Sequence, residues 1–165
     1  MRVRLVPLVL ALLLPLAHAS SALAQEVDWK AGALGHLAPL IGTYRLDDVL
    51  ADPEVAATLA RLVPEEARAR IPLNLQVAGP IDFISGYLVL SGNAPHAGGE
   101  EEAQLWLKVY DGSALVVLTQ SGVRTLYADM ERYSYLPKAL RAQLAASPQD
   151  MLAAKPPALL WHGRE

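Results

Sequence analysis

The positions of apolar and polar residues divide the chain into helical and strand-forming parts. Between Asp52 and Val63, apolar residues recur at the spacing of one helix face. Asp52-Pro53 is a typical helix start, because aspartate caps free N–H groups and proline suits the first turn. A second short helical turn is expected over residues 64–70.

After Pro72 the pattern changes to short runs of aliphatic, aromatic and β-branched residues. Ser-Gly and Asp-Gly pairs separate these runs and predict tight turns at residues 85–86, 111–112 and 121–122. The close spacing of the runs favours an antiparallel meander over βαβ units. Residues 73–77 alternate between apolar and polar and predict a half-buried strand, and residues 40–46 predict a short separate strand.

Helical spacing returns near the C-terminus. Leu136, Leu140 and Leu144 repeat at i, i+4 and i+8, which predicts a helix. The segment 159–161 is too apolar to be wholly solvated, so we expect it to dock on the fold. The pattern predicts one α+β domain over residues 25–165, with a central antiparallel sheet of about five strands and helices packed on one face.

The first 24 residues have the three parts of a secretory signal peptide. Arg2 and Arg4 precede an aliphatic run from Leu5 to Leu16, and a small-x-small pattern ends at Ala24. The run is short for a bilayer span and contains prolines, which disfavours a retained membrane anchor. We therefore expect a periplasmic or secreted protein that is cleaved near Ala24 and Gln25.

Charge and composition narrow the class of partner. Loss of Arg2 and Arg4 leaves twelve Lys and Arg residues against seventeen Asp and Glu, so the formal net charge changes from −3 to −5. A mildly acidic chain does not suit nucleic acids or anionic membranes, but it suits a basic protein partner. There is no cysteine and no phosphate-loop, dinucleotide or HExxH motif. We therefore expect no disulfide, no metal, no cofactor and no enzymatic activity.

A breaker-rich stretch between two strand-forming runs carries the best candidate site. Proline fixes one backbone dihedral beside His96, and nearby glycines allow conformations that other residues avoid. Such a loop has a defined, protruding shape that suits insertion into a cleft. The alternative is an ordinary long hairpin connection. The candidate partner-binding residues are Asn93, Pro95, His96 and Gly98 of the loop Gly92–Gly99, with Glu100, Glu101 and Glu102 as candidate loop support.

With Pro95-His96 in this loop, the chain resembles the periplasmic inhibitors of vertebrate, or C-type, lysozyme. Members of that family have a central antiparallel sheet with helices packed on it. They present a loop with a Lys-Pro-His-Asp core between two disulfide-bonded cysteines. Here Asn93 and Gly98 stand at the cysteine positions, and Ala94 and Ala97 replace the lysine and the aspartate. The loop would therefore lack the disulfide brace and two polar contacts.

The resemblance implies an inhibitor that inserts His96 into the lysozyme cleft and undergoes no chemistry. Lysozyme works with two carboxylates that flank the scissile bond. An imidazole placed between them would donate hydrogen bonds to one or both. An acidic inhibitor would also be steered toward a basic lysozyme.

Three other functions remain open. The missing cysteines favour a divergent envelope binding protein of the same fold, with a different partner and no lysozyme inhibition. A small enzyme would use His96 with a carboxylate as acid and base, and a deep pocket around His96 would favour it. A purely structural protein would bury His96 in packing contacts.

Overall fold

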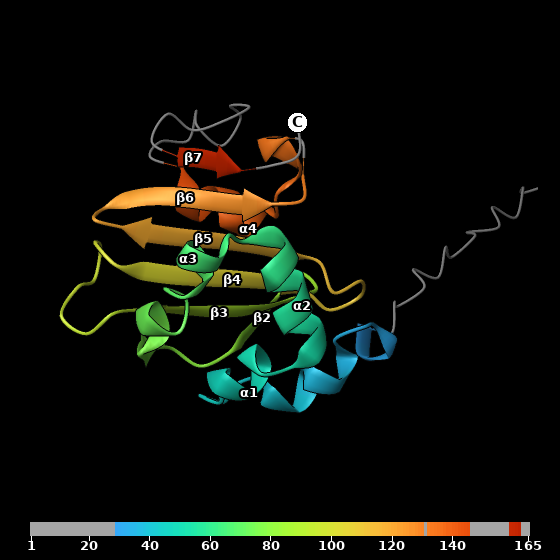
Figure 1. Ribbon diagram of the computed structural model, residues 1–165. Helices are drawn as coiled ribbons and strands as arrows, with labels where there is room; N and C mark the ends of the chain where they lie inside the picture. The colour runs from blue at the N-terminus through green and yellow to red at the C-terminus, as the bar shows by residue number, and fades with distance from the viewer. Residues whose placement is uncertain (1–28, 131, 146–158, 163–165) are drawn as a thin grey trace, which may run out of the picture.

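A mostly antiparallel sheet with short helices on both faces forms the centre of the protein (Figure 1). The computed structural model describes residues 29–130, 132–145 and 159–162, so the expected signal peptide lies outside the described residues. Within the described ranges, no helix is long and apolar enough to cross a membrane. The strands are β1 (Val77–Ala78), β2 (Asp82–Ile84), β3 (Tyr87–Asn93), β4 (Glu102–Lys108), β5 (Ala114–Gln120), β6 (Val123–Ala128) and β7 (Leu159–His162).

The strands lie in the order β1-β3-β4-β5-β6-β7, and β2 also pairs with β3. Every pairing among β1–β6 is antiparallel, which confirms the predicted meander. The expected docking of the C-terminal segment is also confirmed, because β7 pairs in parallel with β6. At the other edge, β1 and β2 are separated by a break that contains Gly79 and Pro80.

Two tight turns connect strands as their sequences predict. Ser85 and Gly86 between β2 and β3 both have positive φ, and so do Ser121 and Gly122 between β5 and β6. Two successive positive φ values are the signature of a type I′ turn, whose twist matches that of the flanking strands. Gly112 in the β4–β5 connection also has a positive φ, of 71°.

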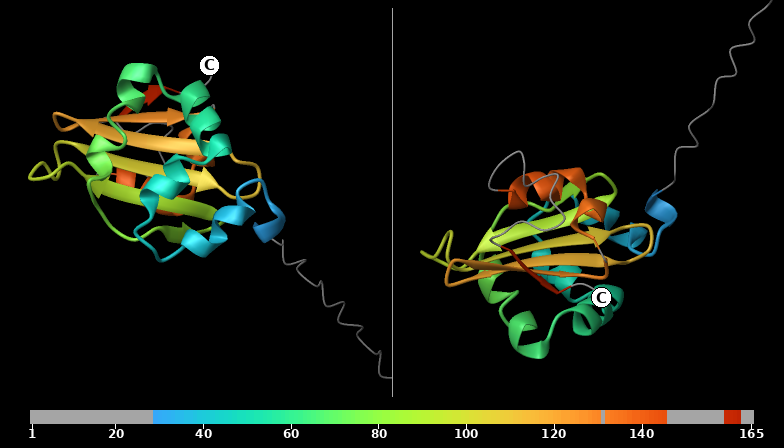
Figure 2. Two further views of the ribbon diagram at one scale, coloured as in Figure 1. Left: turned by 60° about the horizontal axis from the view of Figure 1, so that its bottom comes forward. Right: turned by 90° about the horizontal axis from the view of Figure 1, so that it is seen from above.

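The helices form a layer on each face of the sheet. Figure 2 shows this in the view from above, where α4 lies on one side of the sheet and α1–α3 lie on the other. The helices are η1 (Trp29–Ala31), η2 (Gly35–Leu40), α1 (Leu46–Leu50), α2 (Pro53–Leu62), α3 (Glu65–Arg68), η3 (Leu73–Leu75), η4 (Tyr133–Tyr135) and α4 (Lys138–Leu144), where η denotes a 3-10 helix.

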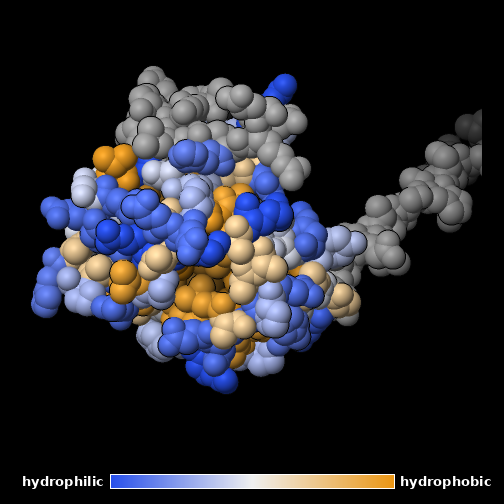
Figure 3. All heavy atoms as spheres, viewed as in Figure 1, coloured by the Kyte–Doolittle hydropathy of each residue, from blue (hydrophilic) through white to orange (hydrophobic). Residues whose placement is uncertain are grey.

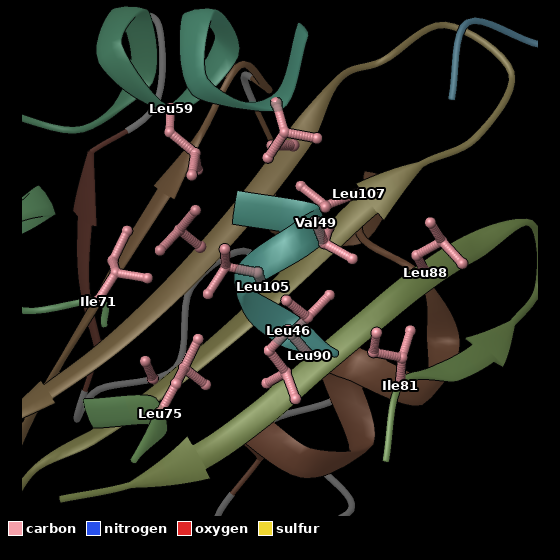
Figure 4. Packing of buried hydrophobic residues seen from close by; sticks show 14 of the residues in the cluster. Leu46, Val49, Leu59, Ile71, Leu75, Ile81, Leu88, Leu90, Leu105 and Leu107 are labelled. Atoms are coloured by element: carbon pink, nitrogen blue, oxygen red, sulfur yellow. The ribbon is translucent and has the colours of Figure 1, made fainter. Parts of the chain in front are cut away.

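Strict alternation along the central strands divides the core into two clusters. The first cluster packs Leu46 and Val49 of α1 against Leu90, Leu105 and Leu107 of the sheet (Figure 4). The second cluster lies on the opposite face. Its members include Val89, Trp106 and Leu115 of the strands and Leu140 and Leu144 of α4. The central strands are therefore buried on both faces, as near-continuous apolar runs in β4 and β5 indicate.

The α+β class is confirmed, but three details of the prediction are wrong. Helices were expected on one face, whereas α4 covers the second face because Leu140 and Leu144 pack around Trp106. In place of a strand over residues 40–46, residues 41–45 form a turn between η2 and α1, where Gly42 has a φ of 79°. Residues 73–75 form η3 and not a strand, and only Val77, the last residue of the predicted strand, belongs to β1.

Buried Asn74 explains why the alternating segment 73–77 is not a strand. Its side chain is 1% exposed, and its Nδ2 donates to the main-chain oxygens of Glu102 (3.3 Å) and Thr119 (3.4 Å). Glu102 and Thr119 are paired residues of β4 and β5. The amide therefore fastens η3 to the sheet, and a single polar side chain overrides the alternating pattern.

Asp52 caps α2 as its sequence predicts and also pairs with an unexpected partner. Its carboxylate accepts from the N–H groups of Glu54 (3.0 Å) and Val55 (3.1 Å) and lies 2.6 Å from Nε2 of His36. The hydrogen bond to Asp52 raises the pKa of His36, against a smaller opposing effect of desolvation. Burial acts to raise the pKa of Asp52, but the bonds from His36, Val55 and Glu54 together outweigh it and lower this pKa.

The His36–Asp52 pair should stabilise the fold most strongly within a limited pH range. The raised pKa of His36 gives a contribution that is complete below about pH 6.5 and is lost as the pH rises through the raised value. The lowered pKa of Asp52 gives a contribution that is complete above about pH 4 and is lost as the pH falls through the lowered value. Urea unfolding should therefore show a larger stability loss for His36→Ala at about pH 5.5 than at about pH 8.5.

Two Asp52 variants separate the pair from the cap. Asp52→Asn keeps a capping side chain, and its stability should no longer respond to His36→Ala with this pH dependence. Asp52→Ala should lose about 1 kcal/mol more than Asp52→Asn. An equal effect of His36→Ala at both pH values would contradict this pH range.

Asn74→Ala should destabilise the fold by about 1–3 kcal/mol, because two main-chain oxygens lose a buried donor. Exposed Gln76, two residues along, is the matched control, and Gln76→Ala should change the free energy of unfolding by less than about 0.5 kcal/mol. Denaturant titration measures both. Similar values for the two variants would mean that the Asn74 amide does not fasten η3 to the sheet.

Candidate partner-binding loop

The candidate loop projects from the end of the sheet where β3 turns back into β4 (Figure 1). Its boundaries differ from the predicted Gly92–Gly99, because Gly92 and Asn93 still belong to β3 and pair with Ala103 and Glu102. The irregular part runs over residues 94–101. Gly92 is placed where a Cβ would lie 2.8 Å from the main-chain oxygen of Val77, so the glycine allows β1 to approach β3.

Hydrogen bonds within the loop hold its backbone. The N–H of Ala94 donates to the oxygen of Glu101 (2.9 Å), which closes the base of the loop. The N–H groups of Ala97 and Glu101 donate to the oxygens of Ala94 (3.1 Å) and Ala97 (2.9 Å). Asn93 adds a bond from its Nδ2 to the oxygen of Ala94 (2.7 Å). The loop is therefore internally connected although the chain has no cysteine.

His96 lies exposed in this loop with an unusual backbone conformation. Its φ is 60°, in the left-handed region that non-glycine residues enter only at a cost. Pro95 and Gly98 beside it are also exposed. Gly99 has a φ of 86°. Such conformations persist where the surrounding structure holds them, and they concentrate at functional sites.

Glu100, Glu101 and Glu102 each accept a hydrogen bond from a different backbone N–H group. Oε1 of Glu102 accepts from the N–H of Gly99 (2.8 Å) within the loop. Oε1 of Glu101 accepts from the N–H of Ser121 (3.0 Å) in the β5–β6 turn. Glu100 accepts from the N–H of Gly122 through its main-chain oxygen (3.1 Å). The carboxylates of Glu101 and Glu102 thus hold separate backbone groups, and the described residues contain no group of three or more His, Asp or Glu placed to hold a metal ion.

Two hollows of the surface were not expected from the sequence. A hollow of about 380 Å³ lies beside the root of the loop, and His96 is not among the residues that line it. A larger, mainly apolar hollow of about 540 Å³ opens between α1, α2 and α3, where orange side chains show through the blue surface in Figure 3. The first hollow is lined mainly by polar residues, among them Ser91, Asn93, Gln104, Thr119, Arg124 and Gln143.

The other two histidines of the expected mature chain take part in local contacts. His36 pairs with Asp52, and His162 of β7 stacks on Tyr127 with ring centroids 5.1 Å apart. Sequence reasoning missed the His36–Asp52 pair and the contact between the loop and Ser121. The Ser-Gly pair at 121–122 predicted a turn, but nothing local to it indicated that this turn would lie against the glutamates.

Comparison with known proteins assigns the chain to a family. The model of the family described as inhibitor of vertebrate lysozyme (Ivy) matches residues 54–150, which is more than half of the chain and includes the whole loop. No curated protein and no solved structure matches the chain. Members of this family are inhibitors and not enzymes. The extent of the family match shows that the chain belongs to the inhibitor of vertebrate lysozyme (Ivy) family.

Proposed function

We propose that this protein inhibits C-type lysozyme in the periplasm or outside the cell by inserting the loop Gly92–Gly99 into the catalytic cleft. The observation that carries the proposal is the placement of His96, which is exposed on a projecting loop and has its backbone in the left-handed region. Family membership supports a lysozyme-inhibitor type of role.

The chemistry of the cleft suits an imidazole. Lysozyme cleaves with two carboxylic groups on either side of the glycosidic bond. An imidazole N–H that reaches this space donates a hydrogen bond to a carboxylate, and the ring occupies the volume that the sugar needs. No bond is made or broken, so the protein acts by occlusion. Pro95 and Gly98 on either side of His96 shape the part of the loop that enters.

Affinity from a loop depends on how much order it already has before binding. Here the backbone bonds at Ala94, Ala97 and Glu101, with the amide of Asn93, take the place of a covalent brace. The formal net charge, −3 for the full sequence and −5 without Arg2 and Arg4 of the expected signal peptide, gives the inhibitor an electrostatic attraction to a basic lysozyme. This attraction raises the association rate and decreases as salt is added.

A divergent binding protein of the envelope is the second candidate. Ala94 and Ala97 favour it, because they carry no polar side chain for a cleft on either side of Pro95-His96. Such a protein would keep the fold and the projecting loop, bind another partner and leave lysozyme active. A lysozyme assay separates the two candidates directly.

His96→Ala should raise the inhibition constant against a C-type lysozyme by at least about tenfold, because the group that enters the cleft is removed. The melting temperature should stay unchanged, since His96 is exposed. His36→Ala is the control, because His36 is an exposed histidine of η2 that pairs with the α2 cap Asp52 and lies outside the loop. Its inhibition constant should match that of the native protein.

The native protein at micromolar concentration must first inhibit lysozyme in the same cell-wall lysis assay. If lysozyme activity is untouched, the proposed function is wrong and the divergent binding protein is favoured. If His96→Ala inhibits as well as the native protein, inhibition stands but insertion of His96 does not.

A further inference from the structure

The β5–β6 turn lies against the root of the candidate loop. Figure 1 shows the β3–β4 loop and the β5–β6 turn projecting at the same end of the sheet, whereas the β4–β5 turn lies at the opposite end. Two hydrogen bonds join them: Ser121 N–H to Oε1 of Glu101 (3.0 Å) and Gly122 N–H to the main-chain oxygen of Glu100 (3.1 Å). Both donors belong to the two positive-φ residues of the turn.

The tip of this turn is open to solvent. Residues 121–124 are all exposed, and the side chain of Val123 is 51% exposed although it begins a strand. The exposed part of the loop, which includes Pro95 and His96, lies at the same end of the sheet. An apolar side chain next to a projecting loop adds contact area to any partner that receives the loop.

We propose that the β3–β4 loop and the β5–β6 turn form one two-part binding surface for lysozyme, in which Glu101 holds the loop against the turn and Val123 contacts the rim of the cleft. This inference rests on the proposed function, which assigns only the loop. Glu101 is a positioning residue here, because it acts on the loop through the turn. Val123 is a contact residue.

The physical reason lies in the kind of bond. A carboxylate that accepts from a backbone N–H forms a charge-assisted hydrogen bond, which is stronger than a neutral one. The bond from Ser121 to Glu101 bridges 20 positions of the chain and adds a side-chain restraint to the main-chain bond from Gly122 to Glu100. Fewer conformations are then lost when the partner binds. The loop enters the cleft while the turn meets its rim in a fixed relative position.

Amide hydrogen exchange of the free protein tests the restraint without any partner. In Glu101→Ala the exchange rate of the Ser121 amide should rise by about tenfold, and Gly122 should follow as the turn separates from the loop. Glu101→Gln keeps an acceptor oxygen but loses the charge, so its exchange rates should lie between those of the native protein and of Glu101→Ala. Glu100→Ala removes a neighbouring carboxylate but keeps the main-chain bond to Gly122, so it controls for charge. Native rates at Ser121 and Gly122 in Glu101→Ala would overturn the restraint.

Inhibition of lysozyme tests the surface. Glu101→Ala should raise the inhibition constant about tenfold at an unchanged melting temperature, and Glu101→Gln, which keeps a neutral acceptor, should have a smaller effect. Val123→Ser should raise the inhibition constant about fivefold, because the variant loses the apolar side chain that would be buried against lysozyme. Tyr110→Ser is the control, since Tyr110 is 65% exposed in the β4–β5 turn.

Inhibition by Val123→Ser equal to that of the native protein would overturn the second contact. A native protein that leaves lysozyme active would instead overturn the proposed function, and with it lysozyme as the partner of this surface. The exchange rates of the free protein would then still support or overturn the restraint by Glu101.

Discussion

The register between β3 and β4 is the constraint on which the rest of the structure depends. Seven residue pairs, from Tyr87 with Lys108 to Asn93 with Glu102, set which side chains point to each face. A slip by one residue would exchange the two faces, placing Trp106 among the residues that α1 and α2 cover. The same register brings Asn93 and Glu102 together at the base of the loop, so the core and the candidate site are specified by one pairing.

The loop shows how a chain without cysteines can order a projecting segment. A disulfide acts at one point, mainly by reducing the freedom of the unfolded chain. Here the restraint is divided among main-chain bonds at the base, the amide of Asn93, and the carboxylates of Glu101 and Glu102. Each bond is weak alone, but each holds a different part of the loop. Order then depends on the folded sheet, since Ser121 reaches the loop only when β5 and β6 are paired.

Sequence patterns predicted the parts of the fold that local chemistry determines. The start of α2 at Asp52 and the turns at residues 85–86 and 121–122 follow from capping and from φ preferences, which act within a few residues. The same applies to the projecting loop, whose glycines and proline lie within four residues of His96. The segment 73–77 was mispredicted because the bonds of Asn74 reach residues 28 and 45 positions away.

Local sequence patterns predicted neither the face of the sheet that α4 covers nor the contact of Glu101 with Ser121. An amphipathic helix shows which of its sides is apolar but not which face of a sheet it will cover. The sequence around a glutamate in a run of three does not indicate which backbone N–H group will donate a hydrogen bond to its carboxylate. The family resemblance, by contrast, depended on the order of elements and on Pro95-His96, and the family match over residues 54–150 confirms it.

The two borders of the sheet bear on how such a protein remains dispersed at high concentration. One border is interrupted between β1 and β2, where Pro80 offers no N–H, and the other is occupied by β7 lying along β6. A continuous unpaired strand is a template on which a second molecule can add its own. At this border β7 covers β6 and is itself the outermost strand, but it is only four residues long, and a short edge strand offers a neighbouring copy few donors and acceptors to pair with.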